Sequence, residues 1–158
     1  MKHLGKLIFV LFLLAGCEDT FDSPPQSLVG VAISTIDTTS TAGTDTLLLT
    51  VYGVGQDSLL EDSSEVTKVS LPLTTANQSS FIFTFNSITD TLTIHHENTL
   101  MAEDAESGFY YEYRITGVDY TKNRIDSVSI PDSTVTTTWN ENIQIYISAL
   151  PDSTVTDQ

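Results

Sequence analysis

The chain has very little positive charge and almost no cysteine. Its 158 residues include 6 Lys and Arg against 21 Asp and Glu, which gives a formal net charge of −15. This balance excludes nucleic acid as a partner, because neutralising phosphates requires clustered Lys and Arg. The single cysteine excludes an intrachain disulfide and any zinc site built from cysteines. Hydrophobic residues still make up 40% of the chain, which is enough for a packed core.

The N-terminus lacks a hydrophobic run long enough to cross a membrane. Leu7–Leu14 is an unbroken apolar stretch of eight residues, whereas a spanning helix needs about 20. Lys2 and Lys6 lie in front of it, and the small residues Ala and Gly lead directly into Cys17. This order is typical of a bacterial lipoprotein signal that is cleaved before its cysteine. We therefore expect a signal peptide over residues 1–16.

Lipid attached to Cys17 would hold the protein on a membrane face. Each buried CH₂ of an acyl chain contributes about 0.8 kcal/mol to such anchoring. We expect a cell-envelope protein anchored in the outer membrane, in either the periplasmic or the surface-exposed leaflet. Residues 17–27 are polar and contain Pro24-Pro25, which predicts a short tether between the lipid and the folded domain.

Apolar residues alternate with polar ones from Leu28 onward, and this period of two predicts β-strands. We expect residues 28–149 to form an all-β fold, an antiparallel Ig-like β-sandwich of about 7–8 strands. A C-terminal tail over 150–158 follows. The hexapeptide PDSTVT occurs at 131–136 and again at 151–156, where we expect a strand-exit turn used twice. The expected strands are 28–36, 46–52, 66–73, 81–85, 91–96, 109–116, 124–130 and 143–147.

Several strand sequences, in this order, resemble an uncharacterised family of Bacteroidota lipoproteins with a single Ig-like domain of unknown function. The sequences that carry the resemblance are Val69-Ser70-Leu71-Pro72-Leu73, Phe81–Phe85, Asp90-Thr91-Leu92-Thr93-Ile94, Gly108-Phe109-Tyr110-Tyr111-Glu112-Tyr113 and Asn140–Ile147. Members often have a Cys before the Gly-Phe step, where this chain has Ser107. The resemblance implies a fold and an envelope location, and it implies no activity.

Aromatic residues are concentrated around one expected strand. Those at spacing two share one face of the strand and are predicted to lie in the core: Phe109, Tyr111 and Tyr113. Three others could form an exposed platform on which a sugar ring stacks: Tyr110, Tyr146 and Trp139. The platform is the feature on which a glycan-binding function would depend.

Asp residues stand in front of Ser or Thr far more often than composition explains. Ten of the 13 Asp do so, and seven of these continue with Leu, Val or Thr. The pattern is similar to a three-residue O-glycosylation signal of envelope proteins; turn formation by Asp is the alternative explanation. The possible acceptor hydroxyls are Thr38, Thr46, Ser58, Thr91, Ser127, Ser133 and Ser153.

Two clusters contain residue types that bind metals. In a strand, His95 and Glu97 point to one side and His96 to the other, so only two ligands converge and zinc is not expected. Glu103, Asp104 and Glu106 offer oxygens to calcium, but their spacing is not that of an EF-hand loop. We therefore expect neither a metal nor a cofactor.

No catalytic motif emerges from the sequence. It contains no Gly-x-Ser-x-Gly elbow, no Gly-rich phosphate loop and no His-Glu-x-x-His. We expect a non-catalytic protein-interaction or structural module that is attached to the membrane through Cys17 and has an envelope protein or a glycan as its partner. The alternatives are a glycan-binding surface module and a small hydrolase that uses paired carboxylates.

Overall fold

Ten strands and no helix make up the part of the chain that the computed structural model describes, residues 24–36, 47–56, 58–102 and 108–148. The strands are β1 (Leu28–Ile36), β2 (Leu49–Gly53), β3 (Leu59–Ser64), β4 (Lys68–Pro72), β5 (Gln78–Phe85), β6 (Ile88–Ala102), β7 (Phe109–Tyr120), β8 (Ile125–Ser129), β9 (Thr134–Val135) and β10 (Glu141–Ser148). The expected all-β fold is therefore confirmed.

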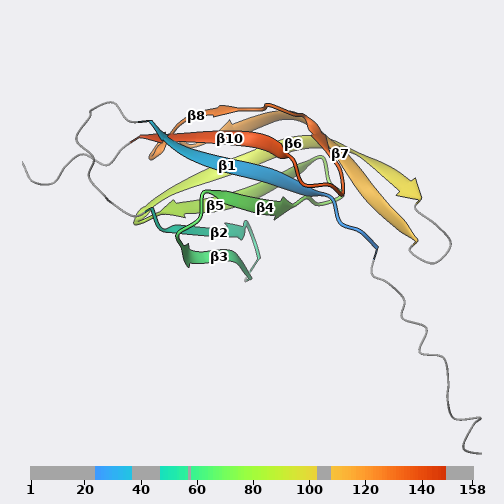
Figure 1. Cartoon of the computed structure of the whole chain (residues 1–158), viewed down its shortest axis with the longest axis horizontal. Coiled ribbons are helices and arrows are strands. Elements are labelled where there is room, and N and C mark those ends of the chain that lie inside the picture. Colours follow the sequence, from blue (N-terminus) through green and yellow to red (C-terminus); the bar gives the residue numbers. More distant parts are fainter. Residues whose placement is uncertain (1–23, 37–46, 57, 103–107, 149–158) are drawn as a thin grey trace, which may run out of the picture.

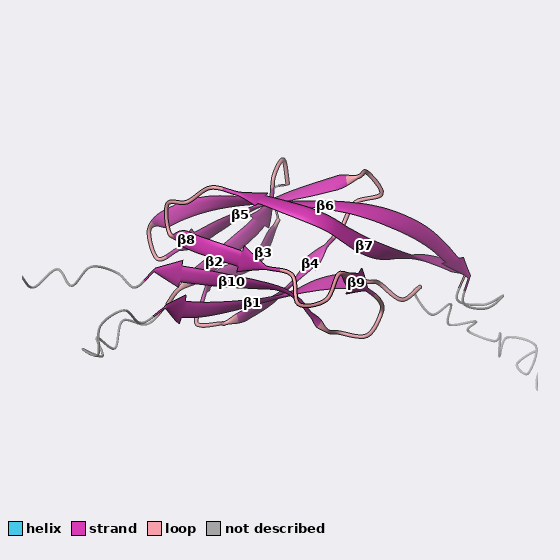
Figure 2. Cartoon of the chain, turned by 90° about the horizontal axis from the view of Figure 1, so that it is seen from above, coloured by secondary structure: helices cyan, strands magenta, loops and turns pink. Residues whose placement is uncertain are grey.

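The strands form two sheets that pack face to face as a sandwich (Figures 1 and 2). One sheet has four strands in the order β4-β1-β10-β8, and the other has six in the order β3-β2-β5-β6-β7-β9. All pairs are antiparallel except β1 with β10, the first and last strands, which run parallel.

The core lies between the sheets and follows from the alternation in the sequence. In β5, Phe81, Phe83 and Phe85 are buried, whereas Ile82 and Thr84 between them are only half-buried. The four-stranded sheet contributes a matching row from β10, and the two rows pack in one hydrophobic cluster. That row consists of Ile143, Ile145 and Ile147. Burial of these side chains, at about 1.5–3 kcal/mol each, is the main stabilising term for the sandwich.

A buried Asn joins the first and last strands where their register shifts. The Asn142 side-chain oxygen accepts a hydrogen bond from the backbone N–H of Gly30 at 3.0 Å. Its amide donates to the Thr134 carbonyl at 2.7 Å and to the Asp132 carbonyl at 3.2 Å. Both ends of this amide are thus satisfied, as burial of a polar group requires, and β1, β10 and β9 are tied together.

Two strands were not expected, and one is much longer than expected. β3 is an edge strand whose polar Glu-Asp-Ser-Ser segment hides any alternation, and β9 has only two residues. β9 lies within the first PDSTVT copy, so that copy leads into a strand as well as out of one; the second copy lies outside the described residues. β6 extends to Ala102, six residues beyond the expected end at residue 96.

Candidate functional site

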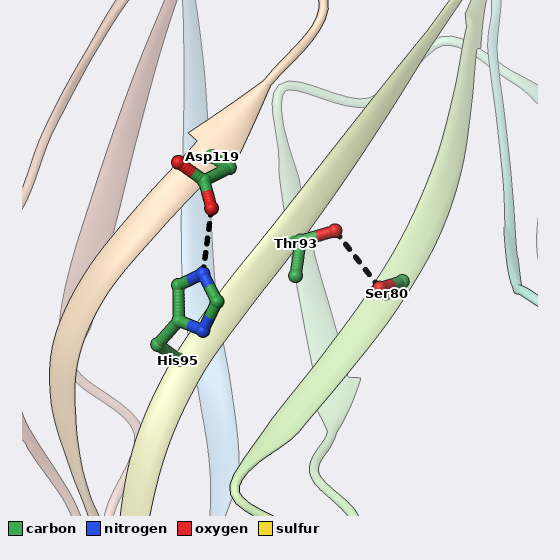
Figure 3. Close-up of polar contacts among 4 residues, drawn as sticks. All are labelled: Ser80, Thr93, His95 and Asp119. Carbon is green, nitrogen blue, oxygen red and sulfur yellow. Dashed lines mark hydrogen bonds and ion pairs between the residues drawn. The ribbon is translucent and has the colours of Figure 1, made fainter.

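The two adjacent histidines of β6 face opposite sides of the six-stranded sheet, as the strand period predicts. On the outer side, His95 Nε2 lies 2.7 Å from Asp119 Oδ2 of β7 (Figure 3). Beside this pair, the hydroxyls of Ser80 and Thr93 are hydrogen-bonded at 2.9 Å (Figure 3). This outer surface is therefore a polar ladder across β5, β6 and β7. In the described residues, no group of three or more His, Cys, Asp or Glu is placed to hold a metal.

His96 lies on the inner side and is only 1% exposed. The expected strand ended at His96, whereas β6 continues for six residues beyond it and keeps this side chain inside the sandwich. Its Nε2 lies 3.0 Å from the Ser79 hydroxyl of β5, and its ring meets the edge of Tyr113 with centroids 5.3 Å apart. Burial, together with the nearby His95, lowers the pKa of His96 below its ordinary value of 6.5.

The polar neighbours of His96 form a chain of hydrogen bonds that indicates where its proton lies. The Ser79 oxygen accepts from the Thr74 backbone N–H at 3.0 Å and lies 3.2 Å from the Thr74 hydroxyl. The Thr74 hydroxyl lies 3.1 Å from the Gln78 carbonyl, to which it can donate. If His96 donates from Nε2 to the Ser79 hydroxyl, that hydroxyl can donate to Thr74 and Thr74 to the Gln78 carbonyl. Every polar hydrogen in this chain then has an acceptor. Nδ1, which is buried without a partner, then carries a lone pair instead of an unsatisfied N–H.

A hollow of about 420 Å³ opens next to Ser79. Its wall combines the β2–β3 connection with the end of β4 and the beginning of β5, and it includes Leu60, Thr74 and Phe81. The described residues that line it carry hydroxyls and amides but no ionisable group. The Ser79–His96 pair at its edge has no acid on His96 Nδ1, which in a Ser-His-Asp triad orients the imidazole. Its geometry is that of a buried structural hydrogen bond.

Asp90 is a buried polar centre whose structural role no local sequence pattern indicates. The carboxylate is 1% exposed and accepts from the Thr121 hydroxyl at 2.5 Å and from the backbone N–H groups of Asn123, Arg124 and Ile125 at 2.7–2.9 Å. Burial raises the pKa of Asp90, but these hydrogen bonds outweigh burial and hold the pKa below its ordinary value of 3.8. Asp90 thus fastens the β7–β8 turn to β6.

The predicted acceptor hydroxyls fall into three groups. Ser58 is exposed in the β2–β3 connection, which is the accessible position that a transferase requires. The second group is half-buried: Thr91 lies in the inner strand β6, Ser127 in the edge strand β8, and Ser133 just before β9. The last group, Thr38, Thr46 and Ser153, lies outside the described residues. So do Cys17 and the acidic residues considered for calcium, which are Glu103, Asp104 and Glu106.

The three aromatic residues considered for a sugar platform do not share one surface. Tyr110 belongs to β7 of the six-stranded sheet, whereas Tyr146 belongs to β10 of the four-stranded sheet. Trp139 lies in the β9–β10 connection, where the Lys68 ammonium sits 5.0 Å from its ring. The arrangement therefore offers separate aromatic side chains rather than a stacking surface.

The predicted row of core aromatics runs out of the core. Tyr113 is buried and Tyr111 half-buried, but Phe109 is 65% exposed, so its assignment to the core is wrong. The reason is that β6 and β7 extend beyond the strands that flank them. β5 pairs with β6 only up to His95, and β9 pairs with β7 only at Tyr113 and Arg114.

A protruding two-stranded ribbon results, visible in yellow and gold at one end of the molecule in Figure 1 and at the same end in Figure 2. We call Thr99–Ala102 and Phe109–Glu112 the β6–β7 arm. In the register of the two strands, Leu100 lies opposite Tyr111, and Ala102 opposite Phe109. The arm is the largest departure of this sandwich from a closed shape, and its apolar side chains make it the leading candidate for a functional site.

Fold and surface together define a class: an all-β sandwich domain that exposes an apolar β-ribbon. The chain belongs to DUF6452, a family of unknown function, which matches residues 48–147. This match confirms the expectation that the chain belongs to an uncharacterised domain family. No curated protein and no solved structure matches the chain significantly. Within the residues that the structure describes, no helix is long and apolar enough to cross a membrane.

Proposed function

We propose that this protein is a bacterial envelope lipoprotein, anchored in the outer membrane through Cys17, and that its sandwich is a non-catalytic module for binding another envelope protein. The observation that carries the interaction role is the β6–β7 arm, a surface built of side chains that water does not favour. The anchoring rests on the sequence: a positively charged start, a short apolar run and small residues before the sole cysteine.

The course of the chain supports a link between anchor and arm. In both views the described chain begins at the end of the sandwich where the arm protrudes (Figures 1 and 2). Eleven residue steps separate Cys17 from Leu28, where β1 begins, so the sandwich begins within about 40 Å of the lipid. The arm is therefore held close to the membrane face.

The polar sites described above favour binding over catalysis. Ser79, His96 and Asp90 are each engaged in hydrogen bonds that hold strands and turns in place. The described residues that line the hollow beside Ser79 are uncharged, so they supply no pair of carboxylates for glycoside hydrolysis. A sandwich that displays an apolar ribbon is better suited to recognising a surface than to transforming a substrate.

The anchor is tested by labelling cells with an alkyne analogue of palmitate and separating membranes from soluble protein. We expect label on the wild-type chain and its recovery in the membrane fraction. Cys17→Ser abolishes the label and releases the protein. The matched control combines Cys17→Ser with Ser129→Cys, which restores a thiol on the exposed side of β8. Label on the Cys17→Ser variant, or membrane retention without label, would contradict the proposal.

A further inference from the structure

The β6–β7 arm continues the core face of the six-stranded sheet into solvent. Side chains two residues apart on a strand share a face, so Leu100 lies on the same side as the buried His96, and Phe109 on the same side as the buried Tyr113. Leu100 is 55% exposed and Phe109 65%. At the arm, the face of the sheet that covers the core elsewhere therefore leaves these two apolar side chains more than half exposed.

Both edges of the arm also lack a neighbouring strand among the described residues. The pairing of β6 with β5 ends at His95; just beyond it the His96 N–H donates to the Asn77 carbonyl at 2.9 Å, and the Asn98 side chain donates to the Thr75 carbonyl at 2.8 Å. On the other side, β9 ends its pairing with β7 at Tyr113. Beyond these points no described strand pairs with the arm, so its outward-facing backbone groups offer an edge to another strand.

The charge of this region indicates what can approach it. Among the described residues the arm contains one carboxylate, Glu112, and no Lys, Arg or His, and the chain as a whole has a net charge of −15. A second copy would bring like charges together, which is unfavourable at an interface. Lipid is disfavoured too, because carboxylates are costly in hydrocarbon and anionic headgroups repel them. A partner surface with an apolar centre and a basic border would complement both the apolar side chains and the negative charge of the arm.

We propose that the β6–β7 arm docks into an apolar groove, bordered by Lys or Arg side chains, on a partner protein at the same membrane face. The inference deepens the proposed function, and the location of the partner rests on it. Leu100 and Phe109 fill the groove, and Glu112, which lies with Thr99 on the other face of the ribbon, meets the basic side chains at its border. Burying one such side chain contributes about 1.5–3 kcal/mol, or roughly a tenfold to hundredfold change in affinity.

The test places a photo-crosslinking amino acid at Leu100 in the full chain, in its native host. The matched control places it at Leu59, which is 50% exposed on β3 at the other edge of the same sheet. We expect a protein adduct at Leu100 at least about tenfold stronger than at Leu59. The crosslinked peptide of the partner should be apolar and flanked by Lys or Arg.

Binding of the purified partner then provides the second measurement. Phe109→Ser and Glu112→Lys should each weaken binding by at least about tenfold, and Glu112→Lys should also reduce its salt dependence. The controls are Leu59→Ser and Glu65→Lys, which change an exposed apolar residue and an exposed carboxylate away from the arm. Thermal unfolding of each variant verifies that the sandwich is intact.

Each remaining outcome would overturn the inference. An adduct with the same chain would show that the arm binds a second copy, and an adduct with lipid would show that it contacts the membrane. Equal adducts at the two positions, or none, would mean that the arm is no docking site. Palmitate labelling in the same cells separates the two proposals: labelled protein without an arm adduct refutes only the docking, and an adduct on unlabelled protein refutes only the anchor.

Discussion

Gly30 has space for a hydrogen atom and for nothing larger. A Cβ at this position would lie 1.9 Å from the carbonyl oxygen of Asn140, a backbone atom that cannot move without shifting β10. Gly30→Ala should therefore lower the free energy of unfolding by about 3 kcal/mol. Denaturant unfolding measures this, with Gly117→Ala as control because a Cβ there meets nothing within 4 Å. Equal stability of the two variants would disprove the close approach.

Asp90 is a buried carboxylate, and the contacts described for it are hydrogen bonds. Asp90→Asn replaces an acceptor by a group that also donates, which should cost about 2–3 kcal/mol at pH 7. Because folding lowers the pKa of Asp90, its contribution is complete above the unfolded value of 3.8 and is lost as pH falls through the folded value.

The difference between wild type and Asp90→Asn should accordingly shrink below about pH 3.8. Urea unfolding at a series of pH values measures it. Asp126→Asn, at an exposed position of β8, serves as control and should match the wild type at neutral pH. A difference that grows in acid would refute the role of the ionised carboxylate.

His96 should make the fold sensitive to mild acid. Burial lowers the folded pKa, so the protein is most stable above the unfolded value of 6.5 and loses stability as pH falls from there toward the folded value. One proton changes the free energy of unfolding by at most about 1.4 kcal/mol per pH unit. His96→Phe should remove this slope, whereas His95→Gln, which keeps the buried imidazole, should retain it. A slope that survives in His96→Phe would assign the acid sensitivity to another group.

At the scale of elements, the β6–β7 arm is separable from the sandwich because none of the other strands that the structure describes pairs with it. Asn98 and Tyr113 are direct partners at its base, so an Asn-Gly turn can join them in place of Thr99–Glu112. We expect this variant to unfold within a few degrees of the wild type and to lose the arm's partner. A large drop in the unfolding temperature, seen by calorimetry, would make the arm a structural element.

Sequence periodicity predicted which way side chains face better than how far each sheet reaches. The opposite directions of His95 and His96 followed from the strand period, but the contact of His96 with Ser79 depends on the register of β5 against β6, which no local pattern encodes. Phe109 has the correct parity for the core; its exposure arises because the neighbouring strands end earlier. The edge strand β3 needs no apolar face, so alternation could not reveal it.

At the scale of the whole molecule, the net charge of −15 works against a compact fold. Carboxylates repel one another across the surface, and salt screens this repulsion over about 10 Å at 0.1 M. Raising NaCl from about 10 mM to about 500 mM should therefore increase the unfolding temperature by a few degrees. Calorimetry at fixed pH measures the effect. A decrease over this range would mean that favourable ion pairs outweigh the repulsion.

The parallel pairing of β1 with β10 gives the molecule a particular order of assembly. The hydrogen bond between Gly30 and Asn142 joins residues 112 positions apart, so closing this contact is a late, entropically costly event. The ribosome synthesises β1 first, and nearly the whole chain must be made before its parallel neighbour β10 exists. The four-stranded sheet therefore cannot be completed until synthesis is almost over.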